Sequence, residues 1–332
     1  MQDRSYNALV VMEKGDNTYS REVQLKKIKD LPDGDLLIRV QYSSLNYKDA
    51  LSASGNRGVT KRYPHVPGID AAGIVEESNS EDFRPGDKVI ATGFDLGMNT
   101  SGGYGQYIRI PAEWAVHCPQ QLSLRESMLY GTAGFTAAQS VDKLINFPVR
   151  PEQGKILVSG ATGGVGSIAI AILTKLSYRV AAVSGKPEAE SFLNQLGAEE
   201  IITRQQAANL SGKLLLREKW AGVIDTVGGE ILATAIKSTA YGGVITCCGN
   251  VASPELPLSV YPFILRGVSL LGIDSAKCPV HTRKRIWQKL SDEWRIEYPD
   301  SQVHDCSLPE LSGIIDEMLL GRHSGRVIVN LL

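Results

Sequence analysis

The pattern of hydrophobic and polar residues changes character near residue 125. Before that point, short runs rich in β-branched and aromatic residues are separated by Gly and Pro turns, such as those at 31–35 and 84–89. Runs of this kind, bounded by turn residues, predict the strands of an irregular antiparallel sheet or barrel. The predicted strands are 7–11, 35–44, 71–78, 87–93 and 105–110.

Beyond a helical pattern at 123–141, apolar strand-like runs alternate with helix-length segments. Such alternation, with strands that are apolar on both faces, predicts a parallel sheet covered by helices on both sides. The predicted strands are 155–159, 179–184, 200–204, 221–227, 242–248 and 267–272, and the clearest helices are 165–176 and 187–196. The last part of the chain predicts helices at 283–296 and 308–319 and a strand at 325–331.

The length of 332 residues favours about two domains. The change in pattern predicts a β-rich domain at 1–125 and an α/β domain of the Rossmann type at 126–275, followed by a C-terminal segment at 276–332. Hydrophobic residues make up 43% of the chain and charged residues 21%, which is ordinary for a globular protein with a full core.

Charge and targeting signals narrow the function classes. Lys and Arg total 35 against 36 for Asp and Glu, without a basic run, so a nucleic-acid partner is not expected. The N-terminal residues lack the apolar core of a signal peptide, and no apolar run approaches the roughly 18 residues of a membrane span. The five cysteines form no C-x-x-C pair, which suits a reducing compartment, so we expect a cytoplasmic protein.

The stretch 159–170, SGATGGVGSIAI, carries the first chemical signal. It follows an apolar strand, opens a helix and sits inside a strand–helix–strand unit, which is the context of a turn that binds a dinucleotide pyrophosphate. Ala161 occupies the first glycine slot of the G-x-G-x-x-G fingerprint, with Gly160 beside it to supply turning freedom. The residues predicted to contact the cofactor here are Thr162, Gly163, Gly164, Val165 and Gly166. The alternative is a glycine loop kept for close packing.

The end of the second strand indicates which cofactor is bound. An NAD enzyme typically places an acidic residue there to bind the ribose 2′-OH. Here the strand ends at Ser184, Gly185 and Lys186, with no acid before Glu188, and Arg204 ends the next strand. Lys186 and Arg204 could meet a 2′-phosphate, which favours NADPH, although two solvated surface bases remain the alternative.

With these residues in place, the chain resembles the medium-chain dehydrogenase/reductase superfamily, in its zinc-free quinone oxidoreductase branch. More narrowly it is similar to the YhdH/YhfP-type proteins, a group that includes acrylyl-CoA reductases. The stretches that carry the resemblance span nearly the whole chain: SSLNYKDAL (43–51), PGIDAAG (67–73), GTAGFTA (131–137), GATGGVG (160–166), AVSGK (182–186), IDTVGG (224–229), PFILRGVSLLGIDS (262–275) and GRVIV (325–329).

The resemblance implies a GroES-like catalytic domain, a Rossmann domain and a chain end that returns to complete the first domain. It implies a homodimer, and a nicotinamide held in the cleft between the domains. It places Asn250, Ile264 and Ser275 on the nicotinamide side. Arg326 lies on the returning strand, where it would contact the cofactor phosphates or else be a surface base.

Zinc is not expected. Zinc-dependent relatives have a His-Glu pair where this chain has Ile69 and Asp70, and a Cys near 46–49, whereas the first cysteine here is Cys118. The five histidines are scattered along the chain. Tetrahedral zinc therefore lacks the ligands that the relatives provide.

Without a metal, a conjugated acceptor is the easier substrate for hydride transfer. Hydride attack at the β-carbon places charge on a carbonyl oxygen, which the protein must stabilise with hydrogen-bond donors. The resemblance implies that Asn46 and Tyr47 line the catalytic cleft, so they are the predicted catalytic residues, with Tyr47 also able to contact the nicotinamide. The alternative is that Asn46 caps the following helix and Tyr47 packs beneath it.

The sequence leaves two chemical types of acceptor open. The leading expectation is acrylyl-CoA or a similar short enoyl-CoA, and the second is a quinone. Arg57 and Lys61 could contact the phosphates of coenzyme A, although a solvated mobile loop is the alternative. A third hypothesis is an NADPH-binding sensor or structural protein with little turnover.

Overall fold

The structure is a computed structural model that describes residues 4–147 and 149–332. Its contacts divide the chain into two units. The first unit contains residues 4–132, 276–291 and 303–332, and the second contains 133–275 and 292–302. The expected domain bounds at 125 and 275 stay predictions, while the contacts assign two C-terminal stretches to the first unit.

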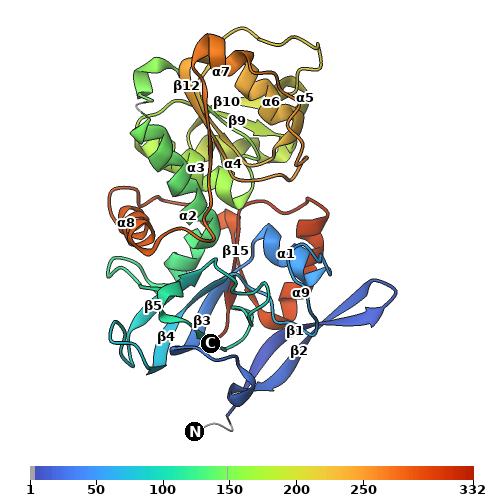
Figure 1. The fold of residues 1–332 in the computed structure, drawn as a ribbon, viewed down its shortest axis with the longest axis vertical. Coiled ribbons are helices and arrows are strands. Elements are labelled where there is room, and N and C mark those ends of the chain that lie inside the picture. The colour runs from blue at the N-terminus through green and yellow to red at the C-terminus, as the bar shows by residue number, and fades with distance from the viewer. Residues whose placement is uncertain (1–3, 148) are drawn as a thin grey trace. The chain divides into compact units, whose positions relative to one another are not determined.

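The first unit is built on a seven-stranded sheet with the order β14-β15-β3-β4-β5-β7, in which β6 also pairs with β3 (Figure 1). All pairs are antiparallel except β14 with β15. The strands are β3 (Leu36–Ser44), β4 (Asp70–Ser78), β5 (Lys88–Thr92), β6 (Tyr107–Ile110), β7 (Ala115–His117), β14 (Val303–Ser307) and β15 (Arg326–Asn330). The C-terminal strand β15 lies directly beside β3, so the end of the chain completes this sheet.

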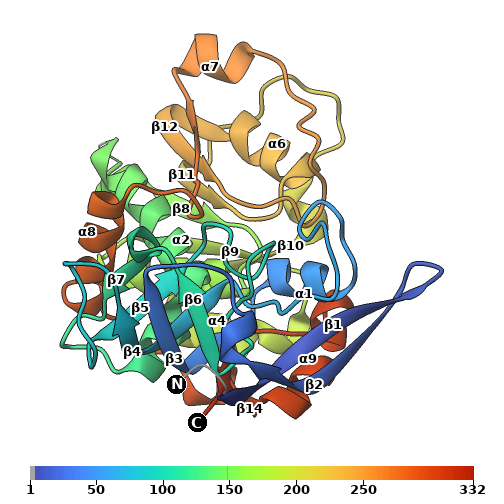
Figure 2. The ribbon, with the colours of Figure 1, turned by 60° about the horizontal axis from the view of Figure 1, so that its bottom comes forward.

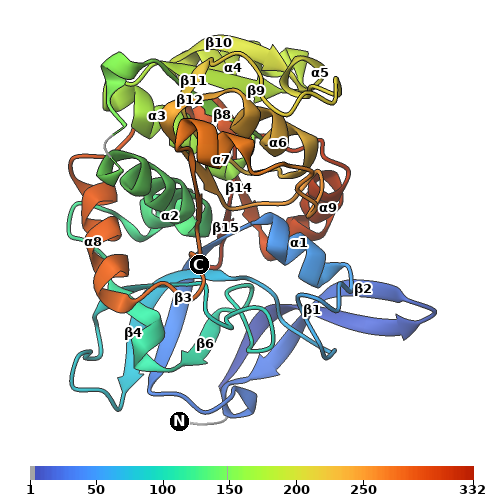
Figure 3. The same ribbon diagram turned by 45° about the horizontal axis from the view of Figure 1, so that its top comes forward.

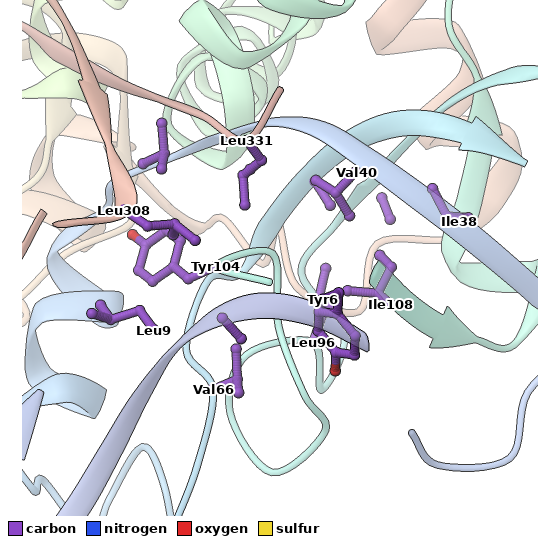
Figure 4. Close-up of a cluster of buried hydrophobic side chains, with 14 of the residues drawn as sticks. Tyr6, Leu9, Ile38, Val40, Val66, Leu96, Tyr104, Ile108, Leu308 and Leu331 are labelled. Carbon is purple, nitrogen blue, oxygen red and sulfur yellow. The ribbon is translucent and has the colours of Figure 1, made fainter. Parts of the chain in front are cut away.

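A long hairpin of β1 (Ser5–Gly15) and β2 (Thr18–Lys27) projects from the first unit (Figure 2). The sequence predicts only the inner part of β1 and does not predict β2, in which polar and charged residues predominate and which is half-buried to exposed along its length. The base of the hairpin packs into the main apolar core, where Tyr6 and Leu9 lie with Ile38, Tyr104 and Leu308 (Figure 4). Residues from both the N-terminal and the C-terminal parts of the chain therefore contribute to one core.

Three helices belong wholly to the first unit: α1 (Tyr47–Ala53), α8 (Val280–Ser291) and α9 (Leu308–Leu319). Helix α9 contacts α1 and the hairpin. Helix α8 is anchored by Arg283, which is 1% exposed and donates to the carbonyl and hydroxyl oxygens of Thr92 at 2.9 and 2.7 Å. The predicted helix at 283–296 therefore begins earlier, at Val280, and ends at Ser291, because the following residues join the other unit.

Helix α2 (Leu124–Asn146) is kinked at Gly131, which has φ +51° and ψ −155°. A Cβ at this position would lie 2.4 Å from Asp70 Oδ2 and 2.5 Å from Ser44 Oγ. The sequence predicts one continuous helix over 123–141, which is wrong at this point. The backbone turns away from helical angles in order to bring Gly131 and Thr132 against a buried carboxylate.

We expect Gly131→Ala to lower the melting temperature by roughly 5–10 °C, because both the backbone conformation and the space exclude a side chain. Differential scanning calorimetry measures this shift. Gly313→Ala is the matched control, since Gly313 lies inside α9, where a Cβ would meet no atom of the described residues within 4 Å and alanine favours a helix. A melting temperature for Gly131→Ala equal to that of the control would show that the kink tolerates a side chain.

The second unit contains a six-stranded parallel sheet with the order β10-β9-β8-β11-β12-β13 (Figure 3). Its strands are β8 (Lys155–Val158), β9 (Val180–Ser184), β10 (Ala198–Thr203), β11 (Trp220–Asp225), β12 (Thr239–Cys247) and β13 (Ser269–Gly272). The order reverses beside β8, so the loop after β8 lies at the switch point where doubly wound sheets bind ligands. The predicted parallel sheet is confirmed.

The helices of this sheet are α3 (Gly164–Lys175), α4 (Glu190–Gln195), α5 (Arg204–Ala207), α6 (Gly229–Lys237) and α7 (Tyr261–Arg266). The predicted helix 187–196 is divided into a short 3-10 turn, Pro187–Ala189, and α4. Helices α5 and α6 share an apolar core with alternate strand residues such as Leu157, Val183 and Val223. Among the described residues, no helix is both long and apolar enough to cross a membrane.

Candidate functional site

The glycine turn joins β8 to α3 in the second unit. Gly160 has φ +58°, and a Cβ there would lie 2.2 Å from Thr226 Oγ1. A Cβ at Gly166 would lie 2.4 Å from the carbonyl oxygen of Gly160, so helix and turn approach too closely for any side chain. A Cβ at Gly163 would meet only the Gly160 carbonyl oxygen, at 3.4 Å. The backbone at Gly163, the N-cap of α3, is therefore not covered by a side chain. A phosphate can approach there to the N–H groups that the first turn of a helix leaves without partners.

Asp225 at the end of β11 supports this turn from the neighbouring strand. It is fully buried and accepts hydrogen bonds from Ser159 Oγ at 2.7 Å and from the N–H of Gly228 at 2.8 Å. Burial raises the pKa of this carboxyl, and the hydrogen bonds oppose that shift. Ser159 Oγ in turn accepts from the N–H of Thr226 at 2.9 Å. The two loops are thus fixed to each other at the carboxyl ends of β8 and β11.

Two cations gather at the end of β9. A Cβ at Gly185 would lie 2.7 Å from Arg204 Nε, so the guanidinium lies against the bare backbone of this glycine. Ser184 Oγ accepts from the N–H of Lys186 at 3.0 Å, which shapes the turn after the strand. Burial lowers the pKa of Lys186, and the charge of Arg204 adds to that effect while Glu188 opposes it. The mutual repulsion of these cations favours an anionic ligand.

A second polar site lies in the first unit around Asp70, at the start of β4. Both oxygens of this fully buried carboxylate are engaged. Oδ2 accepts from Ser44 Oγ at 2.6 Å, Asn46 Nδ2 at 2.8 Å and the Thr132 N–H at 2.9 Å, and Oδ1 accepts from Thr132 Oγ1 at 2.6 Å. Asp70 therefore ties together the end of β3, the start of α1 and the kink of α2.

Asp49 lies beside this network, within α1, and is also fully buried. Its Oδ2 accepts from the Asn46 N–H at 2.9 Å and lies 3.3 Å from Asn46 Nδ2, and its Oδ1 accepts from the Ile69 N–H at 2.8 Å. Burial, together with the negative charge of Asp70, raises the pKa of Asp49 to about 7. The hydrogen bonds from Asn46 and Ile69 oppose this shift without cancelling it.

Sequence profiles of two families match the chain. Residues 32–120 match the alcohol dehydrogenase GroES-like domain, and residues 164–292 match the zinc-binding dehydrogenase family. YhfP of Bacillus subtilis, named provisionally as a quinone oxidoreductase, is 44% identical over 323 residues, which are 96% of this chain and 97% of YhfP. The acrylyl-CoA reductase AcuI of Ruegeria pomeroyi is 41% identical over 98% of this chain and 99% of AcuI.

Solved structures agree with these matches. The crystal structure of B. subtilis YhfP with NAD bound has a TM-score of 0.94 at 44% identity, and covers 99% of this chain and 100% of that one. The chain belongs to the medium-chain dehydrogenase/reductase superfamily, in the YhfP and acrylyl-CoA reductase group. The YhdH oxidoreductase of Salmonella enterica in complex with NADP has a TM-score of 0.94 at 38% identity, covering 98% of this chain and 100% of that one. This chain is therefore an oxidoreductase, and the predicted family and fold class are confirmed.

Among the predicted catalytic residues of this medium-chain reductase, Asn46 is the N-cap of α1. Its side-chain amide donates to Asp70 and faces Asp49, so its hydrogens are directed at carboxylates. Asn46 thus occupies the N-cap position of the capping alternative, and its catalytic role stays a prediction. Tyr47, the first residue of α1, is 40% exposed and so is not packed beneath the helix. Its catalytic role stays a prediction.

Arg326 at the start of β15 is 2% exposed, which excludes the surface-base alternative. Its guanidinium donates to the carbonyl oxygen of Leu129 at 2.7 Å and to Ser44 Oγ at 3.0 Å, and it also contacts the carbonyls of Met128 and Tyr130. These bonds hold the backbone just before the Gly131 kink. They support a structural role, because direct contact with a phosphate would require the guanidinium to leave these carbonyls.

The basic loop after α1 contains the predicted coenzyme A contacts. Arg57 is exposed but already engaged: it donates to Glu13 Oε1 at 2.6 Å and to the Lys61 carbonyl oxygen at 2.7 Å, and its guanidinium lies 5.2 Å from the centre of the Tyr63 ring. Lys61 is exposed, and its backbone N–H donates to Asn99 Oδ1. The solvated-loop alternative therefore fits Lys61 better than Arg57, which is held in a defined position.

The remaining predicted cofactor residues lie in the second unit. A Cβ at Gly228 would come within 3.5 Å of Asn250 Cα, so Asn250 lies beside the loop that Asp225 fixes. Ile264 on α7 is 67% exposed, and Ser275 follows β13 and is half-buried. The roles of these two residues stay predictions.

The donor set of the first unit does not fit the zinc that the family's name implies. Both oxygens of Asp70 are occupied by hydroxyl, amide and backbone donors, and the preceding residue is the apolar Ile69. Over residues 4–147 and 149–332, no group of three or more His, Cys, Asp or Glu side chains is arranged to hold a metal. Because zinc requires several such ligands around one point, we derive no step through a metal. The expected absence of zinc stays a prediction.

The sequence did not identify Asp49, Ser44, Thr132 or Asp225 as parts of these sites. Asp225 could have been found as a carboxylate that ends an apolar strand. The others are ordinary polar residues in sequence, and only the folded chain shows that they meet around one buried group.

Proposed function

We propose that this oxidoreductase binds NADPH and transfers hydride from it to the β-carbon of a conjugated acceptor, with acrylyl-CoA or another short enoyl-CoA as substrate. The observation that carries the proposal is the glycine turn, where Gly163 leaves backbone bare at the N-terminus of α3. This arrangement suits a pyrophosphate. The complexes of YhdH with NADP and of YhfP with NAD, each at a TM-score of 0.94, support a nicotinamide nucleotide as the ligand.

We infer NADPH rather than NADH from the end of β9. An acidic side chain at this position would bind the ribose 2′-OH and repel a 2′-phosphate. The chain has instead Gly185 with Arg204 lying against it, and the half-buried Lys186 beside them. Two cations in such a place can hold the 2′-phosphate through charge-assisted hydrogen bonds.

Tyr47 is the residue we assign to the acceptor. When bound, the reduced nicotinamide would supply the hydride. The 40%-exposed Tyr47 can donate its hydroxyl hydrogen to the carbonyl oxygen on which negative charge develops. The Asp70 network fixes the start of α1, which holds Tyr47 in place. Reduction of an acceptor with a conjugated carbonyl needs this donor and no metal.

A quinone is the second candidate acceptor. It is a conjugated carbonyl compound, and the same donor would serve it. The provisional naming of YhfP as a quinone oxidoreductase, at 44% identity, favours this candidate, whereas the naming of AcuI favours acrylyl-CoA at 41%.

Parallel kinetics test the two acceptors. Purified protein is given NADPH with acrylyl-CoA, crotonyl-CoA or a small quinone, and NADPH oxidation is followed by absorbance. We expect kcat/KM for an enoyl-CoA to exceed that for the quinone by about 100-fold or more, because only the enoyl-CoA offers binding groups along a long carrier. Turnover with the quinone alone would refute the thioester assignment and leave the NADPH assignment standing.

We also infer a homodimer formed through the second unit. Strand β13 ends its sheet and offers an open edge, and the neighbouring segment carries exposed apolar side chains, which commonly mark interfaces. These side chains are Val251, Leu256, Val260, Tyr261, Ile264 and Leu265.

We expect Ile264→Asp to convert the dimer to a monomer, because an unpaired charge in an apolar interface is costly. Light scattering coupled to size-exclusion chromatography measures the mass against the chain mass of 36.0 kDa. Leu210→Asp, at an apolar residue that is 78% exposed in a loop of the same unit, is the control and should stay dimeric. A wild-type monomer, or a dimer that survives Ile264→Asp, would contradict this interface.

A cytoplasmic location is part of the same proposal. All five cysteines are free, including Cys247 and Cys248 in adjacent positions. A protein kept in a reducing compartment shows this pattern. Fractionation of the source cells with an antibody against the protein tests it.

A further inference from the structure

Asp49 and Asp70 form a pair of fully buried carboxyl groups that share one amide group. The side-chain nitrogen of Asn46 lies 2.8 Å from Asp70 Oδ2 and 3.3 Å from Asp49 Oδ2. Besides this amide, Asp70 accepts from two hydroxyls and a backbone N–H, whereas Asp49 accepts from two backbone N–H groups. The better-solvated charge is therefore that of Asp70, and Asp49 is the member that holds a proton more easily.

The groups that face the pair agree with this assignment. On the Asp70 side, the Arg326 guanidinium donates to Ser44 Oγ, which itself donates to Asp70. On the Asp49 side, the fully buried Tyr104 contacts Asp49 through its hydroxyl. Burial raises the pKa of Tyr104 well above its ordinary value, and the charge of Asp49 and its hydrogen bond to Tyr104 add to this shift. A positive charge thus supports Asp70 through a hydroxyl, and a neutral phenol faces Asp49.

The oxygen of Tyr104 can accept a hydrogen bond from a protonated Asp49. The Tyr104 hydroxyl lies 3.3 Å from the carbonyl oxygen of Ser44, so it can donate there while its oxygen accepts the Asp49 proton. When Asp49 is ionised, the same hydroxyl can turn its hydrogen to the carboxylate instead. The hydroxyl therefore has two arrangements, one for each protonation state of Asp49.

We propose that Asp49 and Asp70 are a positioning pair that holds one proton on Asp49 and couples that proton to the placement of Tyr47. The coupling passes through Asn46, which touches both carboxyls and precedes Tyr47 in the chain. Loss of the proton places two like charges on either side of Asn46 and withdraws the Tyr104 hydrogen from Ser44. The start of α1 then shifts and carries Tyr47 with it. The catalytic consequence rests on the proposed function.

The proposal predicts a titration in the physiological range. Since the pKa of Asp49 is raised to about 7, Asp49 is protonated below this pH and ionised above it. An isolated aspartate would ionise near pH 4. If the protonated form places Tyr47 correctly, kcat falls as the pH rises through the midpoint, by up to about tenfold per pH unit.

Two spectroscopic readouts test the pair without relying on turnover. Infrared difference spectra of protein labelled with ¹³C in the aspartate carboxyls follow the C=O band of a protonated carboxyl. Fluorine NMR of protein labelled with fluorotyrosine follows Tyr47, whose signal is assigned by its loss in Tyr47→Phe. We expect both signals in the wild type to change with one midpoint near pH 7. Asp49→Asn should abolish both changes, and Asp33→Asn, at an exposed aspartate of the same unit, should keep them.

The outcomes are distinct. A protonated carboxyl that titrates only near pH 4 would overturn the proposal, and so would a Tyr47 signal that does not follow the carboxyl titration. The wild-type spectra decide this even if Asp49→Asn does not fold. If both titrations are present but no acceptor is reduced, the proposed function fails and the pair stands. If the enzyme is active, a pH profile of kcat that is the same in wild type and Asp49→Asn would also overturn the coupling.

Discussion

Replacing Lys186 and Arg204 together with alanine should raise the dissociation constant for NADPH by about 100-fold and change that for NADH by less than about threefold. Each cation is expected to make a charge-assisted hydrogen bond to the 2′-phosphate worth about 1.5 kcal/mol or more, and two such bonds amount to about 100-fold. Isothermal titration calorimetry with each nucleotide measures both constants. The structure supports the pairing because Arg204 lies against Gly185, directly before Lys186.

The control for this double variant is Arg179→Ala. Arg179 precedes β9, at the opposite end of the strand from Lys186, and pairs with Glu199 at 2.9 Å. It should leave both dissociation constants unchanged. An equal loss of NADPH and NADH affinity in the double variant would contradict the assignment, because it would show that the two cations do not distinguish the 2′-phosphate.

Tyr47→Phe should lower kcat by about 100-fold to 1,000-fold, the range expected when a hydrogen-bond donor to a developing oxyanion is removed. The change deletes only a hydroxyl at an exposed position, so the fold should be unaffected. Single-turnover kinetics with saturating NADPH measure the hydride-transfer step directly. The loss should be largest in kcat, since the hydrogen bond is strongest when charge has developed on the acceptor.

Tyr241→Phe is the matched control, since Tyr241 is 79% exposed in the other unit. Its kcat should equal that of the wild type. A Tyr47→Phe variant with wild-type kcat would remove Tyr47 from the chemistry. In that case the acceptor oxygen would have to be stabilised by another donor, and Asn46 is a poor one because its amide faces two carboxylates.

The second unit could be predicted almost completely from the sequence, because its signals are local. An apolar strand of four or five residues, a glycine turn and an apolar helix identify a dinucleotide-binding unit wherever they occur together. The position of β8, the start of α3 and the basic end of β9 all follow from these patterns. The displaced first glycine is explained by Gly160, which takes the positive φ that the turn requires.

The first unit could be predicted only in outline, because its site depends on contacts between distant segments. Asp70 bonds to Ser44, 26 residues away, and to Thr132, 62 residues away. Such contacts leave no periodic pattern. The kink at Gly131 could not be predicted for the same reason. The local sequence favours a helix, and the buried carboxylate of Asp70 on β4 overrides that preference. Arg326 was expected to contact a phosphate or to be a surface base; it is buried among backbone carbonyls, which excludes the surface base, and its cofactor contact stays a prediction.

The roles of all the predicted site residues stay predictions, but they rest on different kinds of signal. Ile264 and Ser275 were assigned from the resemblance alone, and Lys61 from its positive charge ahead of the catalytic loop. Asn250 was also assigned from the resemblance, and it lies beside the loop that Asp225 fixes.

The central claim is that hydride passes from NADPH to the β-carbon of a short enoyl-CoA such as acrylyl-CoA. The most direct test uses NADPH that carries deuterium at the transferred position of the nicotinamide, with acrylyl-CoA as acceptor, and locates the label in the product by NMR. The account predicts one deuterium at C3 of propionyl-CoA and none at C2, where the proton comes from solvent. Deuterium at C2, or unlabelled acrylyl-CoA recovered unchanged while a quinone is reduced, would contradict it.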